Sequence, residues 1–294
     1  MATPQETRQA VRAYVDYLRD LGVYDLYRRS NPRFLAEPEP VIVTAAAPAP
    51  AIESRPAIPA RPAPASPAPP EFNPAIQESV IAKPISFDLL APLPAARVPA
   101  AQKPEALEAV RETIGDCTRC PLAYGGRRKI VFADGDPNAA LIFVGEGPGA
   151  DEDDQGVPFV GKAGQLLNNM ILAMGLRREQ VYIANIVKCR PPANRTPEFA
   201  EATVCSQFLL QQIDIVQPKI IVALGATAAT YLLGVKQSLA SLRGEWHTCR
   251  GAKVAVTYHP AYLLRDPRQK GEAWKDLQRV MAEMGLKPPQ KPQH

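Results

Sequence analysis

The sequence predicts an α/β fold: a three-layer α/β/α domain with a four-stranded parallel sheet, over residues 105–294. Two observations lead to this prediction. Four β-rich segments alternate with helical segments along this part of the chain, and strands that alternate with helices form a parallel sheet covered on both faces. Each β-rich segment is also followed by small or polar residues, and ligands of such folds bind at the carboxyl ends of the strands.

Residues 1–36 are expected to form an N-terminal helical segment. Thr3, Pro4 and Glu6 provide a helix start signal, and apolar residues then recur at helical spacing up to Gly22. One such segment cannot bury its apolar stripe alone. It either packs on the main domain or on a second copy, or it docks on a protein partner.

Residues 37–104 are expected to form a disordered linker. Half of them are Pro or Ala, so the segment buries too little apolar surface to offset the entropy of ordering it. A Pro-rich tract of this kind acts as a semi-rigid spacer. Near its end, Ile85, Phe87, Leu89 and Leu90 form a small apolar island, which suits a short peptide motif.

The elements of the main domain follow from its apolar pattern. Strands are expected at the β-rich runs 141–144, 181–184, 220–224 and 254–258. Helices are expected where apolar residues recur at helical spacing, at 163–174, 196–214, 226–233 and 269–285. Thr196, Pro197 and Glu198 form the start signal of the second of these helices.

Composition and charge narrow the classes of function. The net charge is only +4, so a nucleic-acid partner requires a local cluster of basic residues. The chain has no apolar run long enough to span a membrane, and its N-terminus lacks the apolar region of a signal peptide. We therefore expect a cytoplasmic protein, monomeric and without a membrane partner. In that compartment the five cysteines indicate a metal site or reactive thiols rather than disulfides.

The residues after the predicted strands are suited to chemistry. In chain order they are the glycine-rich loop 145–149 with the acidic run 151–154, then Asn185, then 225–227, then His259. Parallel strands bring their carboxyl ends to one edge of a sheet, so these groups are expected to lie together. The glycine-rich loop loosely matches a dinucleotide fingerprint, but the acidic run at the next helix start would repel a pyrophosphate. This loop is better suited to stabilising a cation or orienting water.

Four cysteines form a second group. Cys117 and Cys120 make a C-x2-C pair ahead of the first strand, Cys189 follows the second strand, and Cys205 lies in the next helix. Four thiolates hold either tetrahedral zinc or a [4Fe–4S] cluster, and spacing alone does not choose between them. The alternative is a set of separate buried thiols. Cys249, in a predicted hairpin arm, is expected to be a structural thiol.

Two further segments contain candidate binding residues. His259 lies at a strand end rather than in a helix core, which favours a functional over a structural histidine. Leu264 and Arg265 follow it, and an apolar tip beside an arginine can enter a base stack while the arginine meets phosphate. Phe159 is either a core aromatic or a stacking platform for a planar ligand, with Lys162 near a backbone phosphate.

Residues 105–286 resemble the family 4 uracil-DNA glycosylases, the iron–sulfur type of bacteria and archaea. The motifs that carry the resemblance are 145–149 with Glu152-Asp153, Asn185 with 188–192 and Asn194-Arg195, and 259–261 with 263–265. The resemblance implies the uracil-DNA glycosylase fold. It also implies a structural [4Fe–4S] cluster, rather than zinc, on Cys117, Cys120, Cys189 and Cys205.

The resemblance further implies how the base is bound. Phe159 would stack on a flipped-out uracil, Asn185 would read its Watson–Crick edge, and the Gly147 region would add backbone contacts. His259 would donate a hydrogen bond to the uracil carbonyl that gains charge. Contacts to DNA are expected from Lys162, Leu264 and Arg265.

The implied activity is excision of uracil from DNA in base excision repair, leaving an abasic site. Glu146 and Glu152 are the candidates for positioning water or stabilising the sugar cation. No lysine is clearly placed as an amine nucleophile, so a monofunctional enzyme is expected. Residues 189–195 lack the basic insertion and histidine with which some relatives trap DNA covalently, so turnover is expected. The alternative is a non-catalytic iron–sulfur module that binds nucleic acid beside a polymerase.

Overall fold

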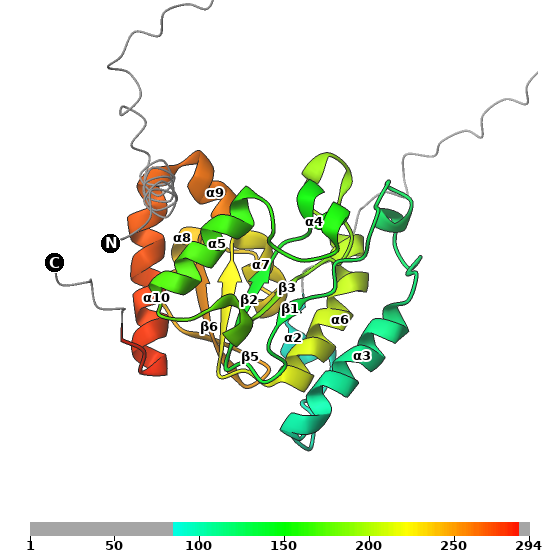
Figure 1. Cartoon of the computed structure of the whole chain (residues 1–294), viewed down its shortest axis with the longest axis horizontal. Helices are drawn as coiled ribbons and strands as arrows, with labels where there is room; N and C mark the ends of the chain where they lie inside the picture. The colour runs from blue at the N-terminus through cyan, green and yellow to red at the C-terminus, as the bar shows by residue number, and fades with distance from the viewer. Residues whose placement is uncertain (1–84, 288–294) are drawn as a thin grey trace, which may run out of the picture. The chain divides into compact units, whose positions relative to one another are not determined.

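The structure, a computed structural model, describes residues 85–287 (Figure 1). These residues all fall within one compact unit. The predicted N-terminal helix and the predicted linker as far as residue 84 lie outside the described residues. Within 85–287, no helix is long and apolar enough to cross a membrane.

A six-stranded mixed sheet forms the centre of this unit. Its four inner strands are parallel and lie in the order β3 (Tyr182–Asn185), β2 (Leu141–Gly145), β4 (Ile220–Leu224) and β6 (Ala252–Thr257). They are the four strands that the sequence predicts. The short strands β1 (Asp134–Gly135) and β5 (His247–Cys249) add antiparallel edges. The predicted four-stranded sheet does not include them. The β5 strand contains Cys249, which the sequence places in a hairpin arm, whereas the two residues of β1 are too few to show an alternating pattern.

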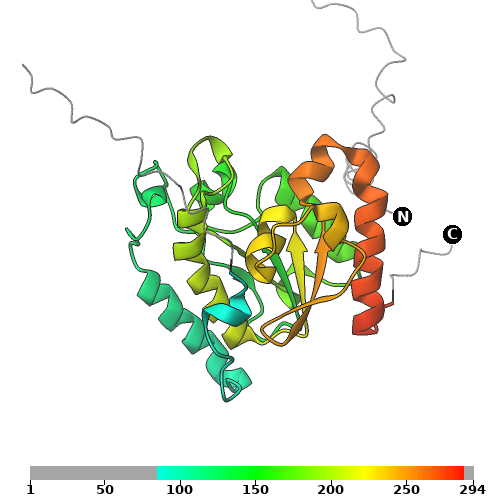
Figure 2. The ribbon, with the colours of Figure 1, turned by 180° about the vertical axis from the view of Figure 1, so that it is seen from behind.

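Helices cover both faces of the sheet (Figures 1 and 2). The α5 helix (Lys162–Ala173) and the α10 helix (Lys270–Met284) pack on one face, where Phe143 and Val222 point. On the other face, one hydrophobic cluster joins the sheet to α3 (Lys103–Ile114), α6 (Phe199–Val216) and α7 (Ala226–Leu233). The inner strands are continuous apolar runs because both of their faces are buried.

The remaining elements are short. Four further α-helices are α2 (Phe87–Leu90), α4 (Ala150–Gln155), α8 (Leu239–Leu242) and α9 (Pro260–Arg265). The 3-10 helices span Ala100–Gln102, Pro121–Ala123, Arg178–Gln180, Pro192–Asn194 and Pro267–Gln269. The α6 helix begins at Phe199 rather than at residue 196, because the Glu201 carboxylate accepts a 2.8 Å hydrogen bond from the Glu198 N–H and caps the helix there.

The apolar island at the end of the predicted linker is part of the folded unit. Phe87 is fully buried, and α2 packs on α7. Arg250 donates hydrogen bonds to the carbonyls of Ala91 (2.5 Å) and Pro92 (2.9 Å), while Asp214 accepts from the same guanidinium. The island therefore anchors the chain to the core at Phe87, and its interpretation as a free peptide motif is wrong.

Candidate active site

The register of the sheet sets where the site residues lie. Gly145 of β2 pairs with Asn185 of β3, and Leu224 of β4 pairs with Thr257 of β6. The inner strands therefore end at the same edge, next to α4 and α9 (Figure 1). A cleft of about 580 Å³ opens at this edge.

Most of the predicted site residues line this one cleft. They are Glu146, Gly147, Glu152, Phe159, Asn185, His259 and Arg265. Lys162 and Leu264 do not line it. Lys162 is exposed at the start of α5, and Leu264 is 42% exposed on α9.

Gly145 brings Phe159 and Asn185 side by side. A Cβ atom at Gly145 would lie 2.4 Å from Asn185 Oδ1 and 2.5 Å from Phe159 Cζ, so only glycine fits there. Asn185 Oδ1 is buried and has no hydrogen-bond partner among residues 85–287. A buried acceptor without a donor costs free energy. Its place in the cleft indicates a ligand that brings a hydrogen-bond donor to this oxygen.

His259 is held as a neutral hydrogen-bond donor. Its Nδ1 accepts a 3.1 Å hydrogen bond from the Ala261 N–H, so the proton lies on Nε2. Burial, together with the positive charge of Arg265 and against the opposing effect of Glu152, lowers the pKa of His259 from 6.5 to about 4. The His259 ring lies 5.6 Å from the Phe159 ring. At neutral pH the cleft therefore contains an uncharged imidazole that donates from Nε2.

The two acidic candidates have different surroundings. Glu146 lines the cleft, and its Oε2 accepts a 2.5 Å hydrogen bond from Thr227 Oγ1, in the first turn of α7. Glu152 instead accepts from three backbone N–H groups. Its Oε2 lies 3.0 Å from Gly149 N, and its Oε1 lies 2.9 Å from Val160 N and 3.0 Å from Gly161 N. Both Glu152 oxygens therefore join the glycine-rich loop to the loop that carries Phe159.

The four predicted metal ligands line a second cavity. Cys117, Cys120, Cys189 and Cys205 surround it together with apolar side chains, among them Ile114 and Phe208. Cys249 lies outside it, buried on β5. Within residues 85–287, no three Cys, His, Asp or Glu side chains are gathered closely enough to hold a single metal ion.

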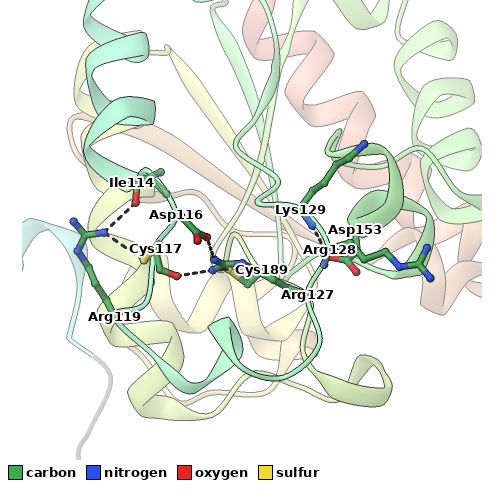
Figure 3. Close-up of polar contacts among 9 residues, drawn as sticks. All are labelled: Ile114, Asp116, Cys117, Arg119, Arg127, Arg128, Lys129, Asp153 and Cys189. Atoms are coloured by element: carbon green, nitrogen blue, oxygen red, sulfur yellow. Dashed lines mark hydrogen bonds and ion pairs between the residues drawn. The ribbon is translucent and has the colours of Figure 1, made fainter.

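Hydrogen-bond donors surround the four sulfurs. Arg119 Nη1 lies 3.3 Å from Cys117 Sγ, and Arg127 Nη1 lies 3.3 Å from Cys189 Sγ (Figure 3). The Lys188 N–H donates to Cys205 Sγ at 3.2 Å. Burial raises the pKa of Cys205 to about 12, so a thiolate there needs nearby positive charge. The donor set suits sulfurs that bear negative charge and bind a metal centre.

Many residues of the cleft were not among the sequence candidates, and three of them show why. Thr227 contacts Glu146, Arg195 forms a salt bridge with Glu201, and Tyr262 is 37% exposed. Each lies in a segment that the sequence singles out, because it follows a strand or belongs to one of the motifs. Nothing in the pattern marks the individual side chain, since only the packed loops show which side chains face the cleft.

Comparisons with known proteins identify the family of this chain. Residues 132–278 match the family model of the uracil DNA glycosylase superfamily. The type-4 uracil-DNA glycosylase of Thermotoga maritima is 49% identical over 166 residues, which cover 55% of this chain and 85% of that protein. The protein of the same name from Pyrobaculum aerophilum is 43% identical over 179 residues, 58% of this chain and 91% of that protein. The protein of the same name from Sulfurisphaera tokodaii is 40% identical over 185 residues, which cover 60% of this chain and 84% of that protein. This chain therefore belongs to the type-4 uracil-DNA glycosylases of the uracil DNA glycosylase superfamily.

Proposed function

We propose that this protein is a monofunctional DNA glycosylase that excises uracil in base excision repair and leaves an abasic site. The names of its relatives indicate the reaction. The single observation that carries the proposal is the unpaired Asn185 Oδ1, buried beside Phe159 in the cleft. Uracil is a planar base whose N3–H, on its Watson–Crick edge, can donate a hydrogen bond to Asn185 Oδ1.

Base selection follows from Asn185 and Phe159. Cytosine has an acceptor in place of the N3–H of uracil, so it would leave Asn185 Oδ1 unpaired. A site built around a buried polar group rejects ligands that leave it unpaired. Stacking on Phe159 contributes about 1–3 kcal/mol to holding the flipped base. That stacking offsets part of the few kcal/mol that flipping costs.

His259 stabilises the leaving base. Cleavage of the N-glycosidic bond places negative charge on the uracil carbonyl oxygens. The neutral imidazole donates from Nε2 to the charged oxygen, and it carries no positive charge at neutral pH because its pKa lies near 4. One preorganised donor of this kind contributes about 3 kcal/mol to transition-state stabilisation.

Glu146 is the carboxylate that acts on the sugar. It lines the cleft, and Thr227 orients it. A carboxylate at this place stabilises the positive charge that develops on the sugar, or positions the attacking water. Glu152 is a positioning residue in this account, because both of its oxygens hold backbone N–H groups. Arg265, Leu264 and Lys162 are the proposed contacts to DNA around the cleft.

The four cysteines line one cavity and are the proposed ligands of a [4Fe–4S] cluster. The resemblance of the sequence to the iron–sulfur type of these glycosylases favours this cluster over zinc. A cluster bound by Cys117, Cys120, Cys189 and Cys205 would tie the segment after α3 to the β3–α6 region. Its proposed role is structural, and the cysteines take no part in the chemistry of the cleft.

We still predict a monomeric, cytoplasmic protein that binds a protein partner through residues 1–36. The non-catalytic module remains the alternative function, although base binding alone does not need Glu146, Asn185 and His259 together.

Uracil release from a single-uracil oligonucleotide tests the proposal. Wild type is compared with Asn185→Ala, and Asn138→Ala serves as the control because Asn138 is exposed and outside the cleft. Wild type and the control should release uracil from single- or double-stranded DNA, detected as alkaline cleavage of the abasic site. Asn185→Ala should be slower by at least about 100-fold. Cluster-loaded wild type that binds DNA but releases no uracil would favour the non-catalytic module.

A further inference from the structure

Phe159 has an unusual backbone conformation. Its φ is +52°, in the left-handed region, which is rare for a bulky residue without a special reason. Such conformations persist only where the surrounding structure enforces them, and they gather at functional sites. The neighbours of Phe159 therefore have to enforce its left-handed backbone conformation.

Arg178 holds the backbone of Phe159 from outside the cleft. Its Nη1 donates to the Phe159 carbonyl oxygen at 3.0 Å, and its Nη2 donates to the Pro158 carbonyl oxygen at 2.5 Å. The guanidinium is itself fixed, because Nε donates to Asp134 Oδ2 at 2.6 Å and Nη1 donates to Asn168 Oδ1 at 2.9 Å. A planar fork with these four partners sets the direction of two successive carbonyls.

Two other contacts enclose the same loop. The Glu152 carboxylate holds the N–H groups of Val160 and Gly161. Gly164 lies so close that a Cβ atom there would sit 1.9 Å from the Phe159 carbonyl oxygen. Glu152 itself lines the cleft, and Gly164 has no side chain to remove. Arg178 lies outside the cleft lining, so its side chain can be changed without removing a group that faces the base.

We propose that Arg178 is a positioning residue that keeps Phe159 in its strained conformation and its ring preorganised for stacking. Without the guanidinium, the carbonyls of Pro158 and Phe159 lose their donors and the peptide relaxes toward negative φ. The ring then leaves its place over Gly145, beside Asn185. This inference rests on the proposed function, because it assigns Phe159 the role of stacking on uracil.

A double-mutant cycle tests whether Arg178 acts through Phe159. The variants are Arg178→Ala, Phe159→Ala and the two together, with Arg177→Ala as the control because Arg177 is an exposed neighbour. The single-turnover rate of uracil release is measured, and the affinity for abasic product DNA is measured beside it. Each single variant should slow release by about 10- to 100-fold, and the double variant should be within about 3-fold of Phe159→Ala. Affinity for product DNA should stay within about 3-fold of wild type, since no base occupies the stacking site.

Two outcomes overturn the inference. One is an Arg178→Ala variant with the wild-type rate. The other is a double variant whose defect is the product of the two single defects, because Arg178 would then act independently of Phe159. If Arg178→Ala does not fold, Arg178→Lys or Asp134→Asn replaces it in the double-mutant cycle with Phe159→Ala. Each weakens the hydrogen bonds of the guanidinium without leaving a cavity, and the same non-additivity is expected. A wild type that releases no uracil would contradict the proposed function instead, so the two failures are distinguishable.

Discussion

At the scale of single residues, the site depends on polar groups whose state is fixed by their neighbours. His259 shows this most clearly. The Ala261 N–H fixes its tautomer, and burial together with Arg265 keeps it neutral. The sequence indicates that His259 is functional because it follows a strand. Its protonation state could not be predicted, since that depends on burial and on a charge that only the folded chain brings near.

The pH dependence of stability tests the state of His259. Its pKa is about 4 in the folded protein and 6.5 ordinarily, so the unfolded chain binds more protons between those values. Stability should therefore rise with pH from about 4 to 6.5, and this gain should be missing in His259→Gln. Thermal unfolding of both proteins across this range measures the difference. The rate of uracil release, measured from pH 5 upward, should show no titration near pH 6.5. A titration there would show that His259 becomes charged and would contradict its neutral state.

Glu146 and Glu152 should respond differently to the same substitution. Glu146→Gln removes charge at the cleft, so release should slow by about 100-fold with little change in melting temperature. Glu152→Gln places an amide group against backbone N–H donors, so it should lower stability by about 1–3 kcal/mol. Activity and thermal unfolding are measured on both. Full activity in both variants would contradict the assignment of a catalytic carboxylate.

At the scale of elements, long apolar strands and helices are predictable and short ones are not. The predicted range 226–233 agrees with α7, and 220–224 agrees with β4. The edge strand β1 is too short to leave a pattern, and β5 is anticipated only as the hairpin arm that contains Cys249. The sequence places the segment around Phe87 in the linker because its neighbours are Pro and Ala, whereas its burial comes from tertiary contacts with α7 and Arg250.

Lys188 joins two elements beneath the site. Its fully buried ammonium donates to the Asn185 carbonyl oxygen at 3.0 Å and to Gln212 Oε1, on α6, at 2.6 Å. Lys188→Met keeps the volume and removes both bonds, so stability should fall by about 1–3 kcal/mol. Uracil release should slow as Asn185 loses its anchor. Lys253→Met is the matched control, because it removes an exposed pair with Glu283. Equal effects of the two substitutions would contradict this role.

At the scale of the whole molecule, the predicted three-layer α/β/α fold is confirmed, with a mixed sheet in place of a parallel one. The alternation of strands and helices predicts the layers, and the rule for strand ends predicts that distant segments meet at one edge. It could not predict Thr227 or Arg178, whose roles depend on how loops pack around that edge. The role of residues 1–36 and their partner stay predictions.

The proposed cluster should stabilise the whole domain. Cys205→Ala should remove the broad absorbance near 400 nm and lower the melting temperature by more than about 5 °C, since the cluster joins distant segments. Cys249→Ala is the matched control, because it is also a buried cysteine but lies outside the cavity. It should keep the absorbance. If the wild-type protein is colourless and contains zinc, the four cysteines bind zinc instead of the cluster, and the roles of the cleft residues are unchanged.

The central claim is that Asn185 Oδ1 accepts the N3–H of a flipped uracil. The most direct measurement compares single-turnover release of uracil and of N3-methyluracil from otherwise identical oligonucleotides. The methylated base pairs poorly and flips more easily, yet it has no donor for Asn185. We predict that its release is at least about 100-fold slower than that of uracil. Equal rates for the two bases would contradict the account.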